Sequence, residues 1–286
     1  MTATITVIAQ GAMGSATAHV LHQGGATVLT WLEGRSAASR ARAEACGMRD
    51  ATLAEIAGSD LILSIVPPGD AMGLATLLAP ALARAPGKAL YADCNAVSPA
   101  TSAEIGAVIT ASGADFVDGG IIGGPPKPGV AGTSFPLSGP HAARAAALLT
   151  AHGLDARVMD APNGAASALK MSYAGITKGL TALAAIMALG ATRAGAGPAL
   201  IAELGDSQAA LRTRFGRGLP DMAPKAYRWV AEMREIADFL KDDPDGAMVY
   251  EGIARLYERL ARPDGEIQTL LDFAAALRQP VTKAGT

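Results

Sequence analysis

The chain has 286 residues, a formal net charge of −2 at pH 7 and 17% charged residues, which excludes the basic surface that nucleic-acid-binding proteins need. Cys46 and Cys94 are its only cysteines, which excludes a disulfide framework or a cysteine-rich metal site and favours a reducing compartment. We find no apolar run that approaches the roughly 20 residues needed to span a bilayer and no basic leader at residues 1–4, so we expect a cytoplasmic protein without membrane partners.

The first predicted unit combines a glycine-containing turn with two strands and a helix. Its parts are a strand over residues 5–9, the turn, an alanine-rich helix that stops before Gly24-Gly25, and a strand over residues 26–31. In this setting the turn predicts dinucleotide binding, because Gly11 lets the backbone approach a pyrophosphate and Gly14 lets the helix pack near the strand. The alternative is a turn without a ligand. The predicted cofactor residues here are Ala9, Gln10, Gly11, Ala12, Met13 and Gly14.

Strands and helices continue to alternate after this unit. We predict a helix over residues 36–46 and strands over residues 60–66, 88–93, 114–118, 133–138 and 155–159. Strands separated by helical crossovers require a mostly parallel sheet with helices on both faces. The pattern therefore predicts a doubly wound α/β domain over residues 1–160.

From Asn163 onward only helical patterns remain. Residues 163–192 contain no proline and predict one helix roughly 40 Å long. Further helices extend to about Leu277, with interruptions expected at residues 197–198, 216–220, 242–246 and 263–265. We therefore predict an all-α domain over residues 161–286, joined to the first domain by the long helix.

Four motifs, in this order, resemble those of the β-hydroxyacid dehydrogenases, which include 3-hydroxyisobutyrate and 6-phosphogluconate dehydrogenases. They are AQGAMG at residues 9–14, DCNAVSP at 93–99, DGGIIGG at 118–124 with the later Gly132-Thr133, and GAASALK at 164–170. The resemblance runs the length of the chain and is closer to the 6-phosphogluconate-dehydrogenase-like branch. It implies a Rossmann-type NAD(P)-binding domain, an oxidoreductase acting on a small molecule, and an intertwined homodimer in which the partner's helices help to close the site.

Lys170 is the best candidate for a catalytic residue. It lies near the start of the long helix, in a run whose other residues are small or apolar. We expect desolvation to lower the pKa of its amine toward the working pH, as a general acid/base requires. On helix pattern alone, a solvated lysine whose stem covers an apolar face is the stronger interpretation. The resemblance, which places the family's catalytic lysine on Lys170, favours catalysis.

Two departures from the family pattern affect the predicted substrate. Ala174 stands where the family has an asparagine that bonds the reacting oxygen, and we expect Tyr173 or Thr177, on the same helix face as Lys170, to replace that donor. Ile122 stands where the family has a serine that holds the substrate carboxylate, which favours a less polar substrate. The backbone N–H groups of Gly123 and Gly124 remain available to an anion. The sequence thus predicts that five of these residues contact substrate: Ile122, Gly123, Gly124, Tyr173 and Thr177.

The end of the second strand bears on the choice between NADP and NAD. Glu33 has the position of a residue that binds the ribose 2′-hydroxyl of NAD, whereas Arg35 and Ser36 suit a 2′-phosphate. We favour NADP, with NAD as the alternative. Two further segments leave strands at the ligand-binding edge: Val66, Pro67 and Pro68, predicted to bind cofactor, and Asn95, predicted to contact nicotinamide or substrate unless it caps a helix.

Other features carry less weight. None of the four histidines has a metal-ligand spacing, so we expect no metal. Trp229 lies in an aromatic cluster that is more often core, and it is predicted to contact substrate only through the resemblance. Two other functions stay open. One is C=N reduction, because the imine reductases resemble this chain from Ile122 to Gly139 but generally carry Asp or Tyr at the position of Lys170. The other is a nucleotide-binding protein that has lost its chemistry.

Overall fold

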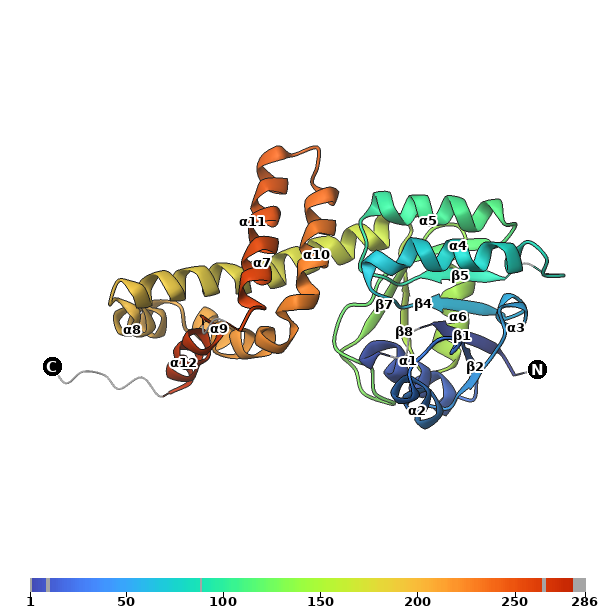
Figure 1. Cartoon of the computed structure of the whole chain (residues 1–286), viewed down its shortest axis with the longest axis horizontal. Coiled ribbons are helices and arrows are strands. Elements are labelled where there is room, and N and C mark those ends of the chain that lie inside the picture. Colours follow the sequence, from blue (N-terminus) through green and yellow to red (C-terminus); the bar gives the residue numbers. More distant parts are fainter. Residues whose placement is uncertain (1, 9–10, 88, 264–265, 280–286) are drawn as a thin grey trace. The chain divides into compact units, whose positions relative to one another are not determined.

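An eight-stranded sheet forms the core of the first half of the chain, as the computed structural model in Figure 1 shows. The structure describes residues 2–8, 11–87, 89–263 and 266–279. The strands are β1 (Thr4–Ile8), β2 (Thr27–Thr30), β3 (Met48–Asp50), β4 (Leu61–Ser64), β5 (Leu90–Asp93), β6 (Asp115–Gly119), β7 (Ser134–Ser138) and β8 (Asp155–Val158). Their order in the sheet is β3-β2-β1-β4-β5-β6-β7-β8, which confirms the predicted doubly wound, Rossmann-type class.

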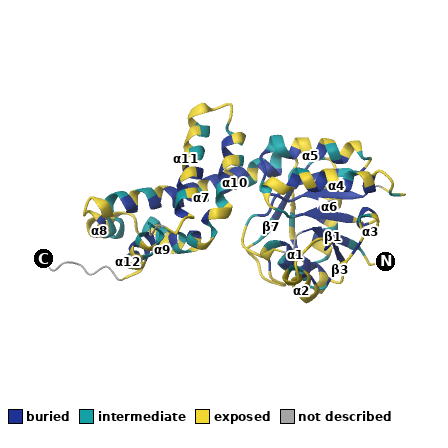
Figure 2. Ribbon diagram, in the orientation of Figure 1, coloured by how far each residue is buried: buried dark blue, intermediate teal, exposed yellow. Residues whose placement is uncertain are grey.

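Helices cover both faces of this sheet (Figure 1). They are α1 (Ala12–Gln23), α2 (Ala37–Ala45), α3 (Leu53–Ala57), α4 (Ala71–Leu82), α5 (Pro99–Ala111) and α6 (Ala142–Ala151). Successive strand residues point to opposite faces, so Leu61 and Leu63 pack with α1, α2 and α6, while Ile62 packs with α3, α4 and α5. Both faces are therefore apolar cores, which is why the central strands β1, β4, β5 and β6 are almost wholly buried, as Figure 2 shows, whereas the edge strands β3 and β8 are largely exposed.

The carboxyl ends of four parallel strands are in register. Ile8 of β1 pairs with Ser64 of β4, Ser64 with Asp93 of β5, and Asp93 with Asp118 of β6. The last two strands run the other way, because β7 pairs antiparallel with β6 after a loop that contains no helix. The aligned ends form the edge of the sheet at which open α/β folds bind ligands.

The second half of the chain is helical, as predicted. Its helices are α7 (Ala165–Arg193), α8 (Gly197–Ser207), α9 (Ala209–Met222), α10 (Ala226–Phe239), α11 (Pro244–Leu260) and α12 (Glu266–Arg278), with a short 3-10 turn at Ala223–Lys225. Another 3-10 turn, Pro68–Asp70, precedes α4 in the sheet unit. The chain divides into two compact units at Met171/Ser172, so the first turns of α7 belong to the sheet unit. We treat each unit by itself below.

The expected interruption at residues 216–220 is wrong, because α9 continues through it. Pro220 has no N–H to donate to the Gly216 carbonyl. That carbonyl instead accepts a hydrogen bond from Nη1 of Arg278 in α12, at 3.0 Å. A side chain at residue 216 would lie 3.2 Å from Cγ of Arg278, so glycine also allows the two helices to pack closely. A contact between residues far apart in sequence thus keeps the helix intact.

The expectation that no segment approaches the length of a membrane span also needs correction. By length and composition, α7 is apolar enough to cross a bilayer. Half of its most apolar window is buried inside the protein, and the core helix of a soluble domain meets the same criteria. Among the described residues, no other helix meets them.

Candidate functional site

The turn before α1 has the features of a phosphate-binding site. Gly11 is the N-cap of α1, no side chain caps this helix, and its first turn contains no acidic residue. A side chain at Gly11 would meet nothing within 4 Å, so the space beside the backbone is open. Uncapped N–H groups and the positive end of the helix dipole suit a pyrophosphate. Ala12, Met13 and the buried Gly14 form the first turn, whereas Ala9 and Gln10 lie outside the described residues.

The loop after β2 presents Glu33 and Arg35 to solvent. Ser36 is used internally, because its hydroxyl caps α2 by accepting a hydrogen bond from the Ser39 N–H at 3.3 Å. Arg40 was not predicted from the sequence. Its Nη2 donates to the Leu32 carbonyl at 2.5 Å, and this contact closes the loop from the α2 side. Arg35 is therefore an exposed cationic residue of this loop.

Asn95 is buried at the ends of β4 and β5, with 2% of its surface exposed. Its side-chain oxygen accepts from the Val66 N–H at 2.7 Å, and its side-chain nitrogen donates to the Ser64 hydroxyl at 2.8 Å and to the Asp93 carboxylate. It does not cap α5, which begins with Ser98 accepting from the backbone N–H of Thr101. In this structure Asn95 fixes the segment of Val66, Pro67 and Pro68 to the sheet, and its contact with a ligand stays a prediction.

Asp118, to which the sequence analysis assigned no role, anchors the start of α7. Its fully buried carboxylate accepts hydrogen bonds from the backbone N–H groups of Gly164, Ala166 and Ser167 at 2.9, 2.9 and 3.0 Å. It also accepts from the hydroxyls of Ser102, Ser138 and Ser167. A carboxylate at the N-terminus of a helix satisfies the unpaired N–H groups and interacts favourably with the helix dipole. The end of β6 and the beginning of α7 are thus joined at one residue.

Lys170 follows this anchor by one turn and packs against the sheet edge. A side chain at Gly120 would lie 3.2 Å from Cβ of Lys170 and 3.4 Å from the Ala166 carbonyl, so glycine makes room for the stem of the lysine. Lys170 itself is half-buried. The Asp-Gly-Gly motif therefore has a local explanation: Asp118 holds the helix, and Gly120 admits the lysine beside the carboxyl end of β6.

Cys94 lies at the same edge but is not a nucleophile. Its thiol is buried, and a side chain at Gly119 would lie 3.0 Å from its sulfur. Burial, with the nearby carboxylates of Asp93 and Asp118, raises the pKa of the Cys94 thiol. A thiol that stays neutral is inert as a nucleophile.

The loop after β6 exposes backbone donors. Ile122 is tied to Ser134 by two hydrogen bonds of 2.9 Å, which fixes its backbone. Gly123 has φ +125°, and a side chain there would lie 2.3 Å from the Gly132 carbonyl, so only glycine fits. The N–H groups of Gly123 and Gly124 donate to none of the described residues. They remain available to an anion, as predicted for substrate.

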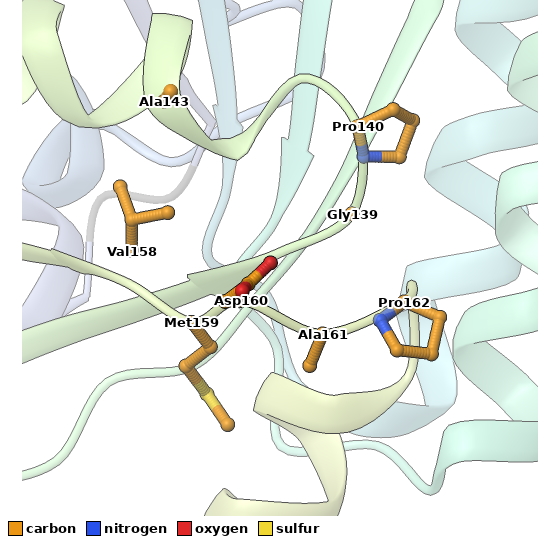
Figure 3. A pocket seen from close by; sticks show the side chains of 8 residues that line it. All are labelled: Gly139, Pro140, Ala143, Val158, Met159, Asp160, Ala161 and Pro162. Carbon is orange, nitrogen blue, oxygen red and sulfur yellow. The ribbon is translucent and has the colours of Figure 1, made fainter.

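A cavity of about 650 Å³ in the sheet unit lies elsewhere (Figure 3). It is lined by the turn after β7, one residue of α6, the last residue of β8 and the segment that follows, namely Gly139, Pro140, Ala143, Val158, Met159, Asp160, Ala161 and Pro162. None of these residues was predicted to bind cofactor or substrate, and Asp160 is the single charged group. Size alone does not mark this cavity as the site, because ligand pockets also need convergent polar groups.

The helical unit brings two of the predicted substrate residues together. Thr177 of α7 and Trp229 of α10 line one cavity of about 570 Å³. Lys178, also in its wall, forms an ion pair with Glu232 and lies 4.9 Å from the centre of the Trp229 ring. Tyr173 is about half exposed and does not line this cavity, and Ala174 is buried.

No metal centre competes with this interpretation in the part of the chain that the structure describes. There, no group of three or more His, Cys, Asp or Glu side chains could hold a metal ion. The residues at the sheet edge instead fit a dinucleotide: an open glycine turn at a helix N-terminus, an exposed guanidinium after β2 and a lysine beside β6.

Comparison with known structures supports the same fold. The conserved protein MTH1747, of unknown function and described as structurally similar to 3-hydroxyacid dehydrogenases, is 26% identical, with 93% of this chain and 98% of that chain covered and a TM-score of 0.71. The 3-hydroxyisobutyrate dehydrogenase of Mycobacterium tuberculosis is 18% identical (97% and 98% covered, TM-score 0.73). The imine reductase of Myxococcus stipitatus in complex with NADP+ is 21% identical (90% and 92% covered, TM-score 0.54). The last two likenesses concern the fold alone.

Comparison with family models gives the assignment. No curated protein sequence matches the chain. Residues 191–260 match a domain of unknown function, DUF1932. Residues 4–153, more than half of the chain, match the NAD binding domain of 6-phosphogluconate dehydrogenase. The chain therefore belongs to the 6-phosphogluconate-dehydrogenase-like family of NAD(P)-binding oxidoreductases.

Proposed function

We propose that the protein catalyses reversible hydride transfer between NADP and a small hydroxy acid or alcohol, or the corresponding carbonyl compound, with Lys170 as general acid/base. When bound, the nicotinamide supplies or accepts the hydride. The observation that carries the proposal is the position of Lys170 against Gly120, one turn after the Asp118 anchor, at the carboxyl edge of the sheet.

Lys170 handles the proton in this scheme. Oxidation of an alcohol requires a base that takes the hydroxyl proton as the hydride leaves, and reduction requires the same group as an acid. The amine of Lys170 can do both, provided that its nitrogen reaches the reacting oxygen. The N–H groups of Gly123 and Gly124 would hold an anionic group of the substrate beside it. Asp118 supports the lysine indirectly, by fixing the helix that carries it.

The preference for NADP rests on the loop after β2. Arg35 is exposed and offers a planar set of donors that matches a phosphate. Glu33 is also exposed. We therefore propose that the 2′-phosphate lies against Arg35 and that Glu33 points to solvent.

We also propose a homodimer formed through α7. Apolar residues recur on one stripe of this helix at spacings of three and four: Tyr173, Ile176, Leu180, Leu183 and Met187. Ile176 is 64% exposed and Met187 is 59% exposed. An exposed apolar stripe with this spacing is typical of a helix that packs against another helix, and a second copy of the chain would present the same stripe.

A substrate screen tests the reaction class. Oxidation of NADPH and of NADH is followed against panels of aldehydes, keto acids and cyclic imines, with the wild type beside Lys170→Ala and the surface control Lys241→Ala. The proposal predicts turnover of carbonyl compounds with NADPH that Lys170→Ala loses and Lys241→Ala keeps. Turnover of imines alone would replace it with C=N reduction. NADPH binding without turnover of any panel member would leave a nucleotide-binding protein.

A further inference from the structure

The cavity between α7, α9 and α10 is open to solvent, because the α9 residues that line it are exposed apart from the half-buried Gly218. Besides Trp229 and Lys178, two threonines of α7, Thr177 and Thr181, line it. The remaining lining residues lie on one face of α9: Ala210, Thr213, Arg214, Arg217, Gly218 and Asp221. Its volume of about 570 Å³ lies within the range of small-molecule pockets. A side chain at Gly218 would lie 3.4 Å from Oγ1 of Thr181, so the two helices come close there.

Two positive charges of this wall are uncompensated. Lys178 is neutralised by Glu232, and Asp221 is neutralised by Lys225. Arg214 and Arg217 form no ion pair with any described carboxylate, although Nη2 of Arg214 lies 3.5 Å from the Thr177 carbonyl. The chain as a whole carries a net charge of −2, so this local excess is not a general property of the surface. The cavity therefore favours an anion.

The threonines of the wall offer acceptors. The hydroxyl of Thr177 donates to the Tyr173 carbonyl at 2.8 Å, that of Thr181 to the Thr177 carbonyl at 3.2 Å, and that of Thr213 to the Ala209 carbonyl at 3.0 Å. A hydroxyl has one proton and two lone pairs. With its proton committed to the helix backbone, each oxygen can only accept a hydrogen bond from a ligand. A ligand that carries hydroxyl groups supplies such donors.

We propose that this cavity binds a small hydroxylated organic anion. Its carboxylate or phosphate group contacts Arg214 and Arg217, and its hydroxyl groups donate to Thr177, Thr181 and Thr213. Trp229 and the Lys178–Glu232 pair form the remaining wall. Binding of this anion does not depend on the proposed hydride transfer. Only the identification of the anion as a substrate rests on the proposed function.

Trp229 provides the signal for a direct test. The chain has two tryptophans, so Trp31→Phe leaves Trp229 as the only one. In this background, without nicotinamide and at constant ionic strength, fluorescence is titrated with malate, glycerol 3-phosphate, succinate and glycerol. We expect saturable changes with the first two, whose relative affinities show whether carboxylate or phosphate is preferred. Succinate, which lacks the hydroxyl, should bind about 3-fold or more weakly than malate, and glycerol should give no saturable change.

Charge variants locate the site. Arg214→Gln with Arg217→Gln should weaken binding about 10-fold or more, the factor that about 1.4 kcal/mol gives. Arg228→Gln is the matched control, because Arg228 is exposed on α10 over the Tyr227 ring, outside the cavity wall, and it should bind as the parent does. Circular dichroism checks that each variant is folded.

Three outcomes would overturn the proposal: no saturable change with either hydroxylated anion, equal affinity in the double variant, or an equal loss in Arg228→Gln. Light scattering on the same samples identifies one reason for failure. If the double variant alters the oligomeric mass while no anion binds, this wall contacts another copy of the chain. Because nicotinamide is absent from the titration, a failure here does not affect the hydride proposal, and retained anion binding with no turnover would count against that proposal alone.

Discussion

Replacement of Asp118 tests how the start of α7 is held. Asp118→Ala removes an acceptor of three backbone N–H groups, those of the half-buried Gly164 and the buried Ala166 and Ser167. The Ala166 N–H keeps the Ser138 hydroxyl, at 3.0 Å, as a second acceptor, so two donors lose their partner. At about 1–3 kcal/mol for each unsatisfied donor, the sum is about 2–6 kcal/mol, a large part of the roughly 5–15 kcal/mol that stabilises a typical domain. We expect this variant to fold poorly or to lose the first turn of α7.

Asp118→Asn separates charge from shape. All three backbone N–H groups donate to Oδ2, while Oδ1 accepts only from the hydroxyls of Ser102 and Ser167, which can rotate to accept instead. An amide can therefore place its oxygen toward the helix and its nitrogen toward the hydroxyls. Asp118→Asn therefore loses only the charge-assisted part of these hydrogen bonds. We expect this loss to lower the free energy of unfolding by about 2 kcal/mol and the melting temperature by roughly 4–8 °C for a unit of this size.

Thermal and urea unfolding measure both variants, and amide hydrogen exchange over residues 164–170 reports the local effect. Asp155→Asn is the control, because this exposed carboxylate pairs with Arg157 on the same strand and should contribute less than about 1 kcal/mol. Stability of Asp118→Ala within about 1 kcal/mol of wild type, with unchanged exchange at residues 164–170, would refute the reasoning.

Three further predictions address the cofactor, the helical core and the dimer. Arg35→Gln should weaken NADPH binding about 10-fold or more and leave NADH binding nearly unchanged, as measured by fluorescence titration; equal losses for both would contradict the phosphate assignment. Burial and the nearby Glu232 raise the pKa of Tyr257, so the contribution of its neutral hydroxyl to stability is complete below pH ~10 and is lost as the pH rises further. Tyr257→Phe, which also removes the 2.7 Å hydrogen bond to the Lys178 carbonyl, should therefore make the free energy of unfolding in urea less dependent on pH above that value. An unchanged pH dependence would contradict the raised pKa. Ile176→Glu should convert the dimer into monomers in light scattering, whereas a variant that keeps the mass of the wild type would exclude α7 as the interface.

Local pattern was enough to predict most of the fold. Apolar runs of four or five residues gave the strands, and the proline-free stretch after Asn163 gave α7. The short β3 and α3 were missed, because three and five residues are too few for periodicity to register. The Thr52 and Glu55 capping box was the available signal for α3.

Residues of the candidate site could be proposed from the sequence where a local motif marks them, as in the glycine turn, or where the resemblance does, as for Lys170. Asp118 and Arg278 act on residues 46 and 62 positions away, and no local pattern indicates such partners. Asn95 likewise turns inward because Ser64 and Val66 lie beside it in the folded sheet. A buried polar residue finds its partners through tertiary structure, which single-sequence reasoning does not provide.

The most direct test of the central claim compares Lys170→Ala and Lys170→Arg with the wild type on the best substrate of the screen. NADPH affinity is measured alongside, so that a lost proton transfer is distinguished from a lost cofactor. We predict a fall in kcat of about 10²–10⁴ in Lys170→Ala and NADPH affinity within about 3-fold of wild type. A Lys170→Ala enzyme that turns over at the wild-type rate would contradict the assignment of Lys170 as general acid/base.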